Sequence, residues 1–338
     1  MYFSDKLCWQ YTKNCSMKEF GANLDRVRKS MQGDKKFLEL YGPHYNKIYQ
    51  MEDLPNGRLS FGEGQEEKYN CLLQKKDSNY LYVFFNGAIG KNIKCKNNFN
   101  RWKWANLVDA NVLNILDPMY FLYHDLPIGW YWGTSETDFR QEIAALIKNA
   151  ASALKVPFSN IVLYGSSAGG TAAIYIAHYI PGCTAVALNP QIRPWKHEWH
   201  KEFKEIVKID TEKYDKFHRN NFYWHLDNTD DCKYIILTNC RSRRDYNWQL
   251  VPVAQHYDFA VEYGLTRYKN LYSWIFDTGE IGRHSALDYP AVFIAIDNFV
   301  RSLKEGVPLK QLNSYVKLIN EFWRDHWELT FQIEKQDT

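Results

Sequence analysis

A serine set between glycines is the first feature of this sequence that could do chemistry. Residues 160–164 form a largely apolar run that leads into Gly165–Gly169 (Gly-Ser-Ser-Ala-Gly), and a helix-forming run, residues 171–179, follows at once. Strand, sharp turn and helix in this order would hold the central serine with its hydroxyl projecting clear of a sheet. The end glycines lack a Cβ, so strand and helix can approach closely. The register makes Ser167, and not Ser166, the predicted nucleophile; a plain glycine-rich turn is the alternative.

A histidine late in the chain could supply the base that this serine needs. At pH 7 a serine hydroxyl is a weak nucleophile until an adjacent base takes its proton. His284 stands in a glycine-containing loop just after the strand-like run 271–276, and a helix-like run begins a few residues later. His256 lies inside an amphipathic helix-like run and is the weaker candidate. We therefore predict His284 as the base.

An aspartate on a neighbouring loop could hold that histidine in its working tautomer and stabilise its charge. Asp245 follows the apolar run 233–238, so it would lie beyond the carboxyl end of that strand. Asp230 and Asp231 precede the same strand and would lie at its other end. Asp277 ends the last strand and is the runner-up. We predict Asp245 as the acid, with a plain salt bridge to a neighbouring arginine as the alternative.

Motifs that would indicate a bound metal or nucleotide cofactor are incomplete. Residues 197–200 (His-Glu-Trp-His) are one residue short of the His-Glu-x-x-His spacing that places two zinc ligands one helical turn apart. The sequence also has no Cys-x-x-Cys, no phosphate-binding loop and no complete dinucleotide fingerprint. We predict no metal and no permanently bound cofactor.

Composition indicates a folded protein of the cytoplasm. The chain has 338 residues, of which 45% are hydrophobic and 24% charged, and its net charge of +3 gives no ground for a nucleic-acid partner. The seven cysteines are odd in number and scattered, which favours reduced thiols over a disulfide framework. Residues 1–10 lack the apolar stretch of a secretory signal, and no apolar run approaches the ~20 residues of a membrane span. A peripheral membrane contact stays open.

The elements that must position these residues can be read from the apolar pattern. Strand-like runs occupy residues 58–61, 69–74 and 80–85, and the turn residues 76–79 predict that the last two pair antiparallel. Strands and helices then alternate, which predicts a mainly parallel sheet. The predicted strands are 110–116, 160–164, 185–188, 233–238 and 271–276, and the predicted helices are 20–32, 137–154, 171–179, 251–263, 289–303 and 309–329.

Four short motifs together carry a resemblance. Tyr-Gly-Ser-Ser-Ala-Gly-Gly at 164–170, Phe-Phe-Asn-Gly-Ala at 84–88, Asp245 and Gly-Arg-His-Ser at 282–285 resemble the α/β-hydrolase superfamily. Within it, they are similar to bacterial capsule and surface-polysaccharide O-acetyltransferases and related esterases.

The resemblance, over about residues 57–305, implies an α/β-hydrolase fold, with a mostly parallel central sheet and helices on both faces. Residues 193–231 interrupt the alternation of strands and helices, and the resemblance implies a helical cap there. Residues 1–56, an N-terminal extension, and 306–338, a C-terminal helical segment, lie outside it.

The resemblance also implies an oxyanion hole built from backbone N–H groups. One donor would be Ala168, directly after the nucleophile. The second would come from the loop after the strand 80–85, where the sequence does not decide between Gly87 and Ala88. Both donors would point at the charge that develops on the substrate oxygen.

Three arginines crowd the loop that carries Asp245. Arg241, Arg243 and Arg244 suit phosphates or carboxylates, which arginine binds in bidentate fashion. We predict that they bind an anionic donor or acceptor, with a solvated basic loop as the alternative.

The function implied by the resemblance is acyl transfer. Ser167 would take an acetyl group from acetyl-CoA, the co-substrate, and pass it to a hydroxyl of a polysaccharide or oligosaccharide acceptor. An aromatic content of 16% suits such a ligand. Peripheral association with a membrane-bound capsule assembly complex follows from the same resemblance. A serine esterase or deacetylase is the alternative, and a catalytically silent scaffold is a third, which the intact set of Ser167, His284 and Asp245 argues against.

Overall fold

The computed structural model describes residues 35–46, 53–64, 66–90, 98–214, 218–229, 231–278, 283–284 and 290–335. The helix predicted over residues 20–32 lies outside the described residues.

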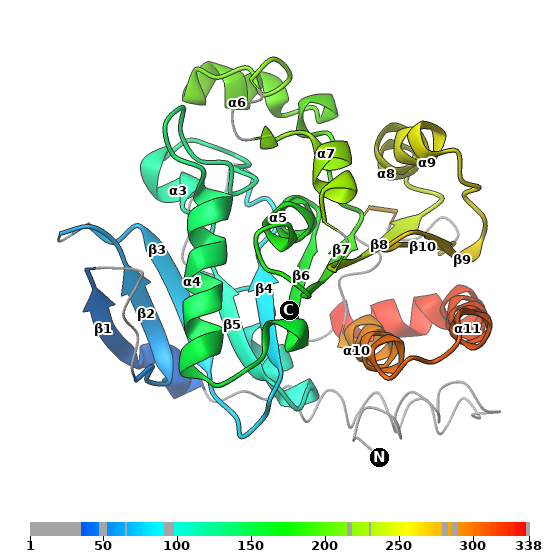
Figure 1. Ribbon diagram of the computed structural model, residues 1–338, viewed down its shortest axis with the longest axis horizontal. Helices are drawn as coiled ribbons and strands as arrows, with labels where there is room; N and C mark the ends of the chain where they lie inside the picture. Colours follow the sequence, from blue (N-terminus) through cyan, green and yellow to red (C-terminus); the bar gives the residue numbers. More distant parts are fainter. Residues whose placement is uncertain are drawn as a thin grey trace.

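One sheet of ten strands organises the described part of the molecule, in the order β1-β2-β3-β5-β4-β6-β7-β8-β10-β9 (Figure 1). The strands from β5 to β10 in this order are all parallel. Antiparallel pairs occur where β3 joins β2 and β5, and where β9 joins β10. The strands are β1 Tyr41–Tyr45, β2 Gly57–Phe61, β3 Tyr69–Gln74, β4 Leu81–Phe85, β5 Asn111–Ile115, β6 Ile161–Ser166, β7 Thr184–Leu188, β8 Lys233–Asn239, β9 Gly264–Tyr268 and β10 Leu271–Phe276.

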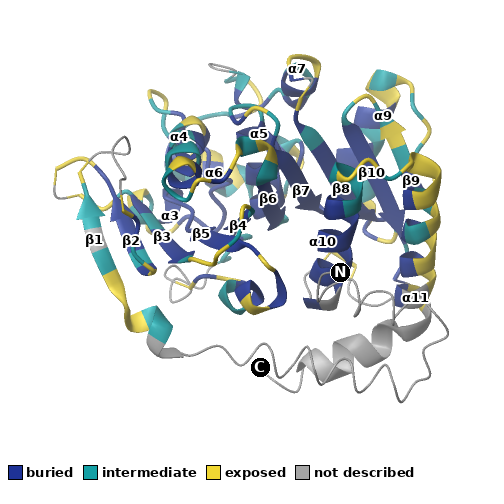
Figure 2. Cartoon of the chain, turned by 60° about the horizontal axis from the view of Figure 1, so that its bottom comes forward, coloured by how far each residue is buried: buried dark blue, intermediate teal, exposed yellow. Residues whose placement is uncertain are grey.

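Helices cover both faces of this sheet, which is the α/β-hydrolase arrangement that the sequence predicts (Figure 2). The α-helices are α3 Met119–Leu122, α4 Phe139–Ala153, α5 Ala168–Ala177, α6 His200–Val207, α7 Phe222–Asp227, α8 Arg243–Asp245, α9 Val251–Tyr257, α10 Pro290–Lys304 and α11 Leu309–Lys335. Shorter turns are η1 Lys35–Glu39, η3 Trp102–Leu107, η4 Phe158–Asn160, η5 Pro194–Lys196 and the π-helical η7 Tyr246–Leu250.

The central strands are buried on both faces, and their side chains alternate between two cores. Along β4, Leu81, Val83 and Phe85 point into the core beneath α4 and α5. Tyr82 and Phe84 point into the opposite core, which α10, α11 and η3 complete. This alternation is the period of two expected of a strand, and burial on both sides explains why the sequence shows an unbroken apolar run.

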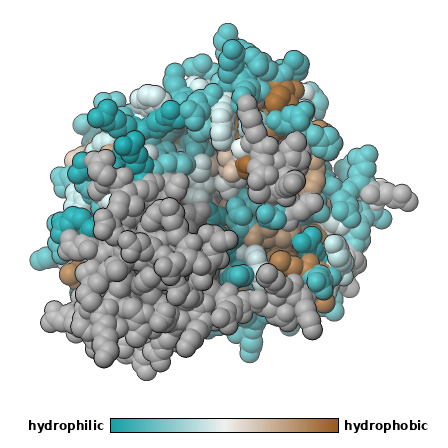
Figure 3. Space-filling view, turned by 180° about the vertical axis from the view of Figure 1, so that it is seen from behind, coloured by the Kyte–Doolittle hydropathy of each residue, from teal (hydrophilic) through white to brown (hydrophobic). Residues whose placement is uncertain are grey.

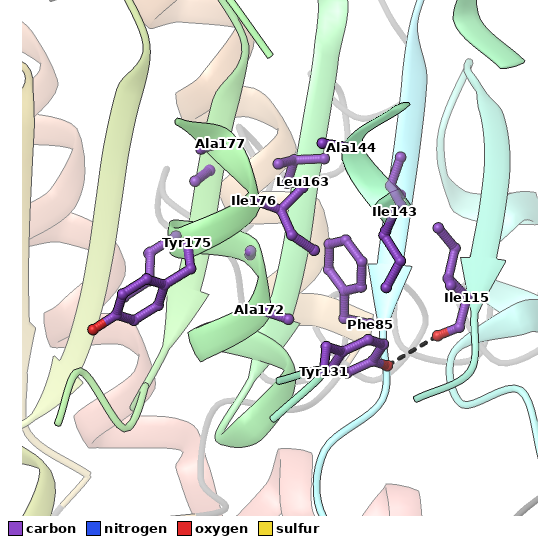
Figure 4. Close-up of a cluster of buried hydrophobic side chains, with 14 of the residues drawn as sticks. Phe85, Ile115, Tyr131, Ile143, Ala144, Leu163, Ala172, Tyr175, Ile176 and Ala177 are labelled. Carbon is purple, nitrogen blue, oxygen red and sulfur yellow. Dashed lines mark hydrogen bonds between the residues drawn. The ribbon is translucent and has the colours of Figure 1, made fainter. Parts of the chain in front are cut away.

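The first core fixes α5 against the strands that flank the serine turn. Figure 4 shows Ala172 and Ile176 of α5 directed toward Phe85 of β4 and Leu163 of β6. The Tyr131 hydroxyl donates to the backbone oxygen of Ile115, 2.9 Å away. The helix that follows Ser167 is therefore held by packing along its length.

The predicted antiparallel pairing of residues 69–74 with 80–85 is wrong. β5 lies between β3 and β4, antiparallel to β3 and parallel to β4. The intervening turn leads past the start of β5 into a crossover instead of a hairpin, and the Asn111 side chain at the start of β5 bonds to this turn. That side chain accepts from the Lys76 N–H at 2.9 Å and donates to the Ser78 backbone oxygen at 2.8 Å.

The helix predicted over residues 251–263 is too long. α9 ends at Tyr257, where Asp258 adopts a left-handed conformation with φ 51°. Gly264, at φ 104°, then opens β9, an edge strand that pairs antiparallel with β10. The sequence gives no alternation strong enough to predict β9, since only its first two residues are buried.

Both outer segments set apart by the sequence contribute to the fold where the structure describes them. β1 pairs with β2 in parallel. In α11, the Trp323 ring stacks on Trp274 of β10 at a centroid distance of 5.7 Å and is buried. Seen from behind, the described surface is largely hydrophilic, with small apolar groups between polar ones (Figure 3). Among the described residues, no helix has both the length and the apolar character needed to cross a membrane.

Candidate active site

Ser167 occupies the turn between β6 and α5 in a backbone conformation that few residues adopt. Its φ and ψ are 55° and −123°. Non-glycine residues are rarely found there, and such strain persists only where the surroundings hold it. Here the Ser167 N–H donates to the Leu188 oxygen at 2.9 Å, and the Ser167 oxygen accepts from the Thr171 N–H at 3.0 Å. The turn is thereby fixed to both the next strand and the helix.

The glycines of the motif are required by close approach of backbone to backbone. A Cβ added at Gly165 would lie 2.3 Å from the carbonyl carbon of Gly169. One added at Gly169 would lie 2.4 Å from the backbone oxygen of Phe85. Real Cβ atoms do not approach this closely, so the Gly-x-Ser-x-Gly pattern is a consequence of how tightly α5 sits on β6 and β4.

His284 and Asp245 form a hydrogen-bonded pair although they are far apart in sequence. Nδ1 of His284 lies 2.6 Å from Oδ2 of Asp245. The Asp245 side chain is 4% exposed and the His284 side chain 43% exposed. The Ser242 hydroxyl donates to the same carboxylate oxygen, and the Asn189 side-chain amide donates to the His284 backbone oxygen at 2.7 Å. Hydrogen bonds to the ring and to the backbone oxygen of His284 thus fix the orientation of its imidazole.

The weaker candidates lie in other environments. The Asp277 carboxylate accepts from Nε of Arg241 at 2.9 Å. His256, in α9, stacks on the Tyr223 ring at a centroid distance of 4.2 Å. The structure therefore brings Asp245, and not Asp277, to the ring of His284.

Ser167, His284 and Asp245 all line one cavity of about 440 Å³. Gly87 and Ala88 line it as well. A Cβ added at Gly87 would stand 3.9 Å from the Ser167 Cβ, so the loop after β4 runs directly beside the serine. Ala168, the remaining predicted oxyanion donor, is the first residue of α5 and is buried.

Gln191, which the sequence does not predict as a site residue, contacts the serine directly. Its Nε2 donates to Ser167 Oγ at 2.7 Å, and its Oε1 accepts from Nε1 of Trp130 at 3.2 Å. The Gln191 side chain is buried, and its backbone N–H and oxygen both bond to the Thr171 hydroxyl. One signal could have found it, because it follows a buried strand that neighbours β6 and so lies at the same edge of the sheet.

Arg101 is a second residue at the serine turn that the sequence does not predict. Its guanidinium donates to the Phe85 backbone oxygen at 3.0 Å and to the Ser166 hydroxyl at 2.6 Å. It therefore joins the end of β4, where the loop with Gly87 begins, to the residue that precedes Ser167. Ser166 thus has a structural partner of its own.

The three arginines of the basic loop separate in space. Arg244 lines the cavity and pairs with Glu198 at 2.6 Å. Arg241 pairs with Asp277, and neither Arg241 nor Arg243 is among the described residues that line the cavity. The structure brings one of the three to the candidate site.

Polar and aromatic side chains from the segments that follow β7 and β8 also line the cavity. Lys196, Glu198 and Trp199 line it from the region of η5 and α6, and Trp248 lines it from η7. Burial lowers the pKa of His197, a further lining residue, to about 4, so this ring is neutral at pH 7. Within the described residues, no group of three His, Cys, Asp or Glu side chains could hold a metal ion.

No protein-family model and no curated protein sequence matches the chain. Solved structures are similar to it at low identity. The capsule O-acetyltransferase of Neisseria meningitidis serogroup A is 15% identical, with a TM-score of 0.48 over 71% of this chain and 92% of that one. An acetyl xylan esterase from Paenibacillus sp. R4 is 13% identical, with a TM-score of 0.43 over 69% and 79%.

The Glycosylation Associate Protein (Gap123) complex from Streptococcus agalactiae is 14% identical, with a TM-score of 0.46 over 62% of this chain. The match covers 40% of the Gap123 chain. At these identities the function has to be argued from the site itself.

Proposed function

We propose that the protein is a serine-dependent acyltransferase that acetylates a glycan hydroxyl through an acyl-Ser167 intermediate. The observation that carries the proposal is the 2.6 Å contact between His284 and Asp245 at the cavity that also holds Ser167. Nucleophile, base and orienting acid on one cavity are the parts that acyl transfer requires.

In the first step, Ser167 Oγ attacks the carbonyl carbon of an acetyl thioester, with acetyl-CoA as the donor. His284 takes the serine proton and returns it to the leaving thiolate, which departs as free thiol. Asp245, buried and bonded to Nδ1, stabilises the charged imidazole. Backbone N–H groups of Ala168 and of Gly87 or Ala88 stabilise the transient oxyanion.

In the second step, an acceptor hydroxyl attacks the acyl-serine ester while His284 takes its proton. The proton then passes to Ser167 Oγ, so the enzyme returns to its starting state. Trp199 and Trp248 line the cap side of the cavity, where flat aromatic faces suit a sugar ring. We propose a polysaccharide or oligosaccharide as the acceptor there.

An esterase or deacetylase acting on similar glycans is the second candidate function. The observation that favours it is the exposure of His284, whose side chain is 43% accessible. Water that reaches this ring could replace the sugar hydroxyl as the acceptor of the acyl group.

One assay separates the two functions. The protein is given acetyl-CoA with and without a polysaccharide acceptor, and free thiol and acetylated sugar are followed separately. Acceptor-dependent thiol release with acetylated product supports the transferase. Release at the same rate without acceptor, or loss of acetyl groups already on the polymer, shows that water is the acceptor.

We place this reaction in the cytoplasm, where its proposed donor is made. We further propose peripheral contact with a membrane-bound capsule assembly complex. Co-sedimentation of the protein with membranes that contain such a complex, compared with membranes that lack it, tests the contact.

A further inference from the structure

A second cavity, of about 350 Å³, lies beside the candidate active site. It is formed by Leu38 of η1, Arg58 of β2 and the stretch 98–104. Asn100 lines both this cavity and the one that holds Ser167. The volume is in the range of small-molecule sites, which run from about 300 to 1,000 Å³.

The described side chains that line this cavity give it a cationic character. Arg58, Arg101 and Lys103 line it, and no Asp or Glu does among the described residues. Arg58 and Lys103 form no ion pair in the described part of the chain, and Nε of Arg58 is buried without a hydrogen-bond partner. A buried guanidinium nitrogen without a partner is costly unless an acceptor completes it, which can be a water molecule or an anion.

Aromatic rings stand next to these cations. Phe99, Trp102 and Trp104 line the cavity. The Arg58 guanidinium lies 5.5 Å from the Phe99 ring centre, and the Lys103 ammonium lies 5.8 Å from that of Trp102. Trp104 is buried against Phe293, whereas Trp102 is half-buried and packs against the cluster of Leu72, Phe99 and Leu116. Cations beside a half-buried aromatic ring suit a planar base that carries phosphates.

Residues of this cavity also contact the serine turn. Arg101 lines the cavity and donates to the Ser166 hydroxyl, next to the predicted nucleophile. A ligand with its anionic end here could therefore extend past Asn100 toward Ser167. The cap side of the active site, with Trp199 and Trp248, stays free for an acceptor.

We propose that this cavity binds the phosphorylated adenosine end of the acyl donor, with phosphates at Arg58 and Lys103 and the base against Trp102. The inference rests on the proposed function, since it names where the donor of that reaction is held. It places the anionic donor away from the basic loop of Arg241 and Arg243.

Binding of adenosine 3′,5′-bisphosphate and of free coenzyme A, measured by calorimetry on the full chain, tests the site. The unmodified protein should bind both ligands. Arg58→Gln and Lys103→Gln should each weaken binding about tenfold or more, because charge-assisted hydrogen bonds are among the strongest polar contacts. Lys310→Gln, at an exposed position on α11, is the matched control and should bind as the unmodified protein does. Thermal unfolding of each variant confirms that it is folded.

Hydrolysis of a small neutral ester separates this inference from the proposed function. Arg58→Gln and Lys103→Gln should hydrolyse p-nitrophenyl acetate normally while their KM for acetyl-CoA rises. The proposed site would be wrong if the enzyme is active but Arg58→Gln, Lys103→Gln and the control Lys310→Gln all bind coenzyme A with the same affinity. Tighter binding of UDP than of adenosine 3′,5′-bisphosphate would also overturn it, because the cavity would then serve a nucleotide-activated sugar. If the protein binds adenosine 3′,5′-bisphosphate but acts on no ester, the proposed function is contradicted and the proposed binding site is not.

Discussion

The side-chain amide of Gln191 donates a hydrogen bond to Oγ of Ser167 over 2.7 Å. An NH₂ group can only donate, so the serine oxygen accepts here and its own proton is left for a base. The other end of the amide accepts from Trp130, which fixes its orientation. We infer that Gln191 positions the serine oxygen for attack.

Replacing Gln191 by Ala should lower kcat about 2- to 13-fold and leave KM nearly unchanged. A net hydrogen bond contributes roughly 0.5–1.5 kcal/mol, which corresponds to this range. Hydrolysis of p-nitrophenyl acetate measures it. Gln141→Ala, at an exposed position of α4, is the control. An unchanged kcat in Gln191→Ala would show that the contact has no part in turnover.

Replacing each of the two adjacent serines by alanine should have opposite effects on turnover. Ser167→Ala should abolish turnover, because it removes the proposed nucleophile. Ser166→Ala should keep most of it, because the Ser166 hydroxyl bonds to Arg101 and precedes the turn. Mass spectrometry after a phosphonofluoridate label identifies the reactive serine. A label on Ser166, or on neither serine, contradicts the assignment.

The carboxylate that faces His284 should matter and its neighbour should not. Asp245→Asn should lower kcat by about 10² to 10⁴, since an amide cannot stabilise the imidazolium and favours the wrong tautomer. Asp277→Asn should be nearly silent, because that carboxylate pairs with Arg241. Both variants replace a carboxylate by an amide, and their kcat values are compared on the same ester. The reverse result would make Asp277 the acid.

Local signals made the centre of this fold predictable. The strands that precede Ser167 and Asp245 are buried on both faces, so their apolar runs are unbroken and easy to place. The turn at Ser167 requires glycine on both sides, and these glycines lie close to the serine in the sequence, where they form a recognisable motif. His284 and Asp245 could be nominated because each follows a strand whose carboxyl end faces the same edge.

Contacts set by the whole sheet could not be read from the sequence. β3 and β4 are consecutive, yet β5 separates them, and the Asn111 side chain that bonds to the intervening turn has no local signature. Gln191 and Arg101 reach the serine turn from loops 24 and 65 positions away from the serines they contact. The place of Gln191 just after a buried strand could have nominated it, but no periodicity in the sequence marks the contact that either residue makes. The edge strand β9 is half exposed and lacks an apolar run.

A histidine cluster between α5 and α7 should make the fold sensitive to acid. His225 of α7 is buried, its Nε2 bonds to the His218 backbone oxygen at 2.8 Å, and its ring lies 4.6 Å from that of His178. Burial, with His178 and Arg140 nearby, lowers the pKa of His225 to about 3. Burial also lowers the pKa of His178.

The sign of the effect follows from the unfolded value, which is about 6.5 for histidine. The unfolded chain takes up a proton at His225 as the pH falls below 6.5, and the folded chain does not until about pH 3. The free energy of unfolding should therefore be highest above pH 6.5 and fall toward pH 3, by at most about 1.4 kcal/mol per pH unit for this group. His225→Gln, which keeps a donor for the His218 oxygen, should flatten that fall between pH 6.5 and 4.5 in urea unfolding. His124→Gln, at an exposed position, should follow the unmodified protein, and equal slopes in all three proteins would mean that acid acts elsewhere.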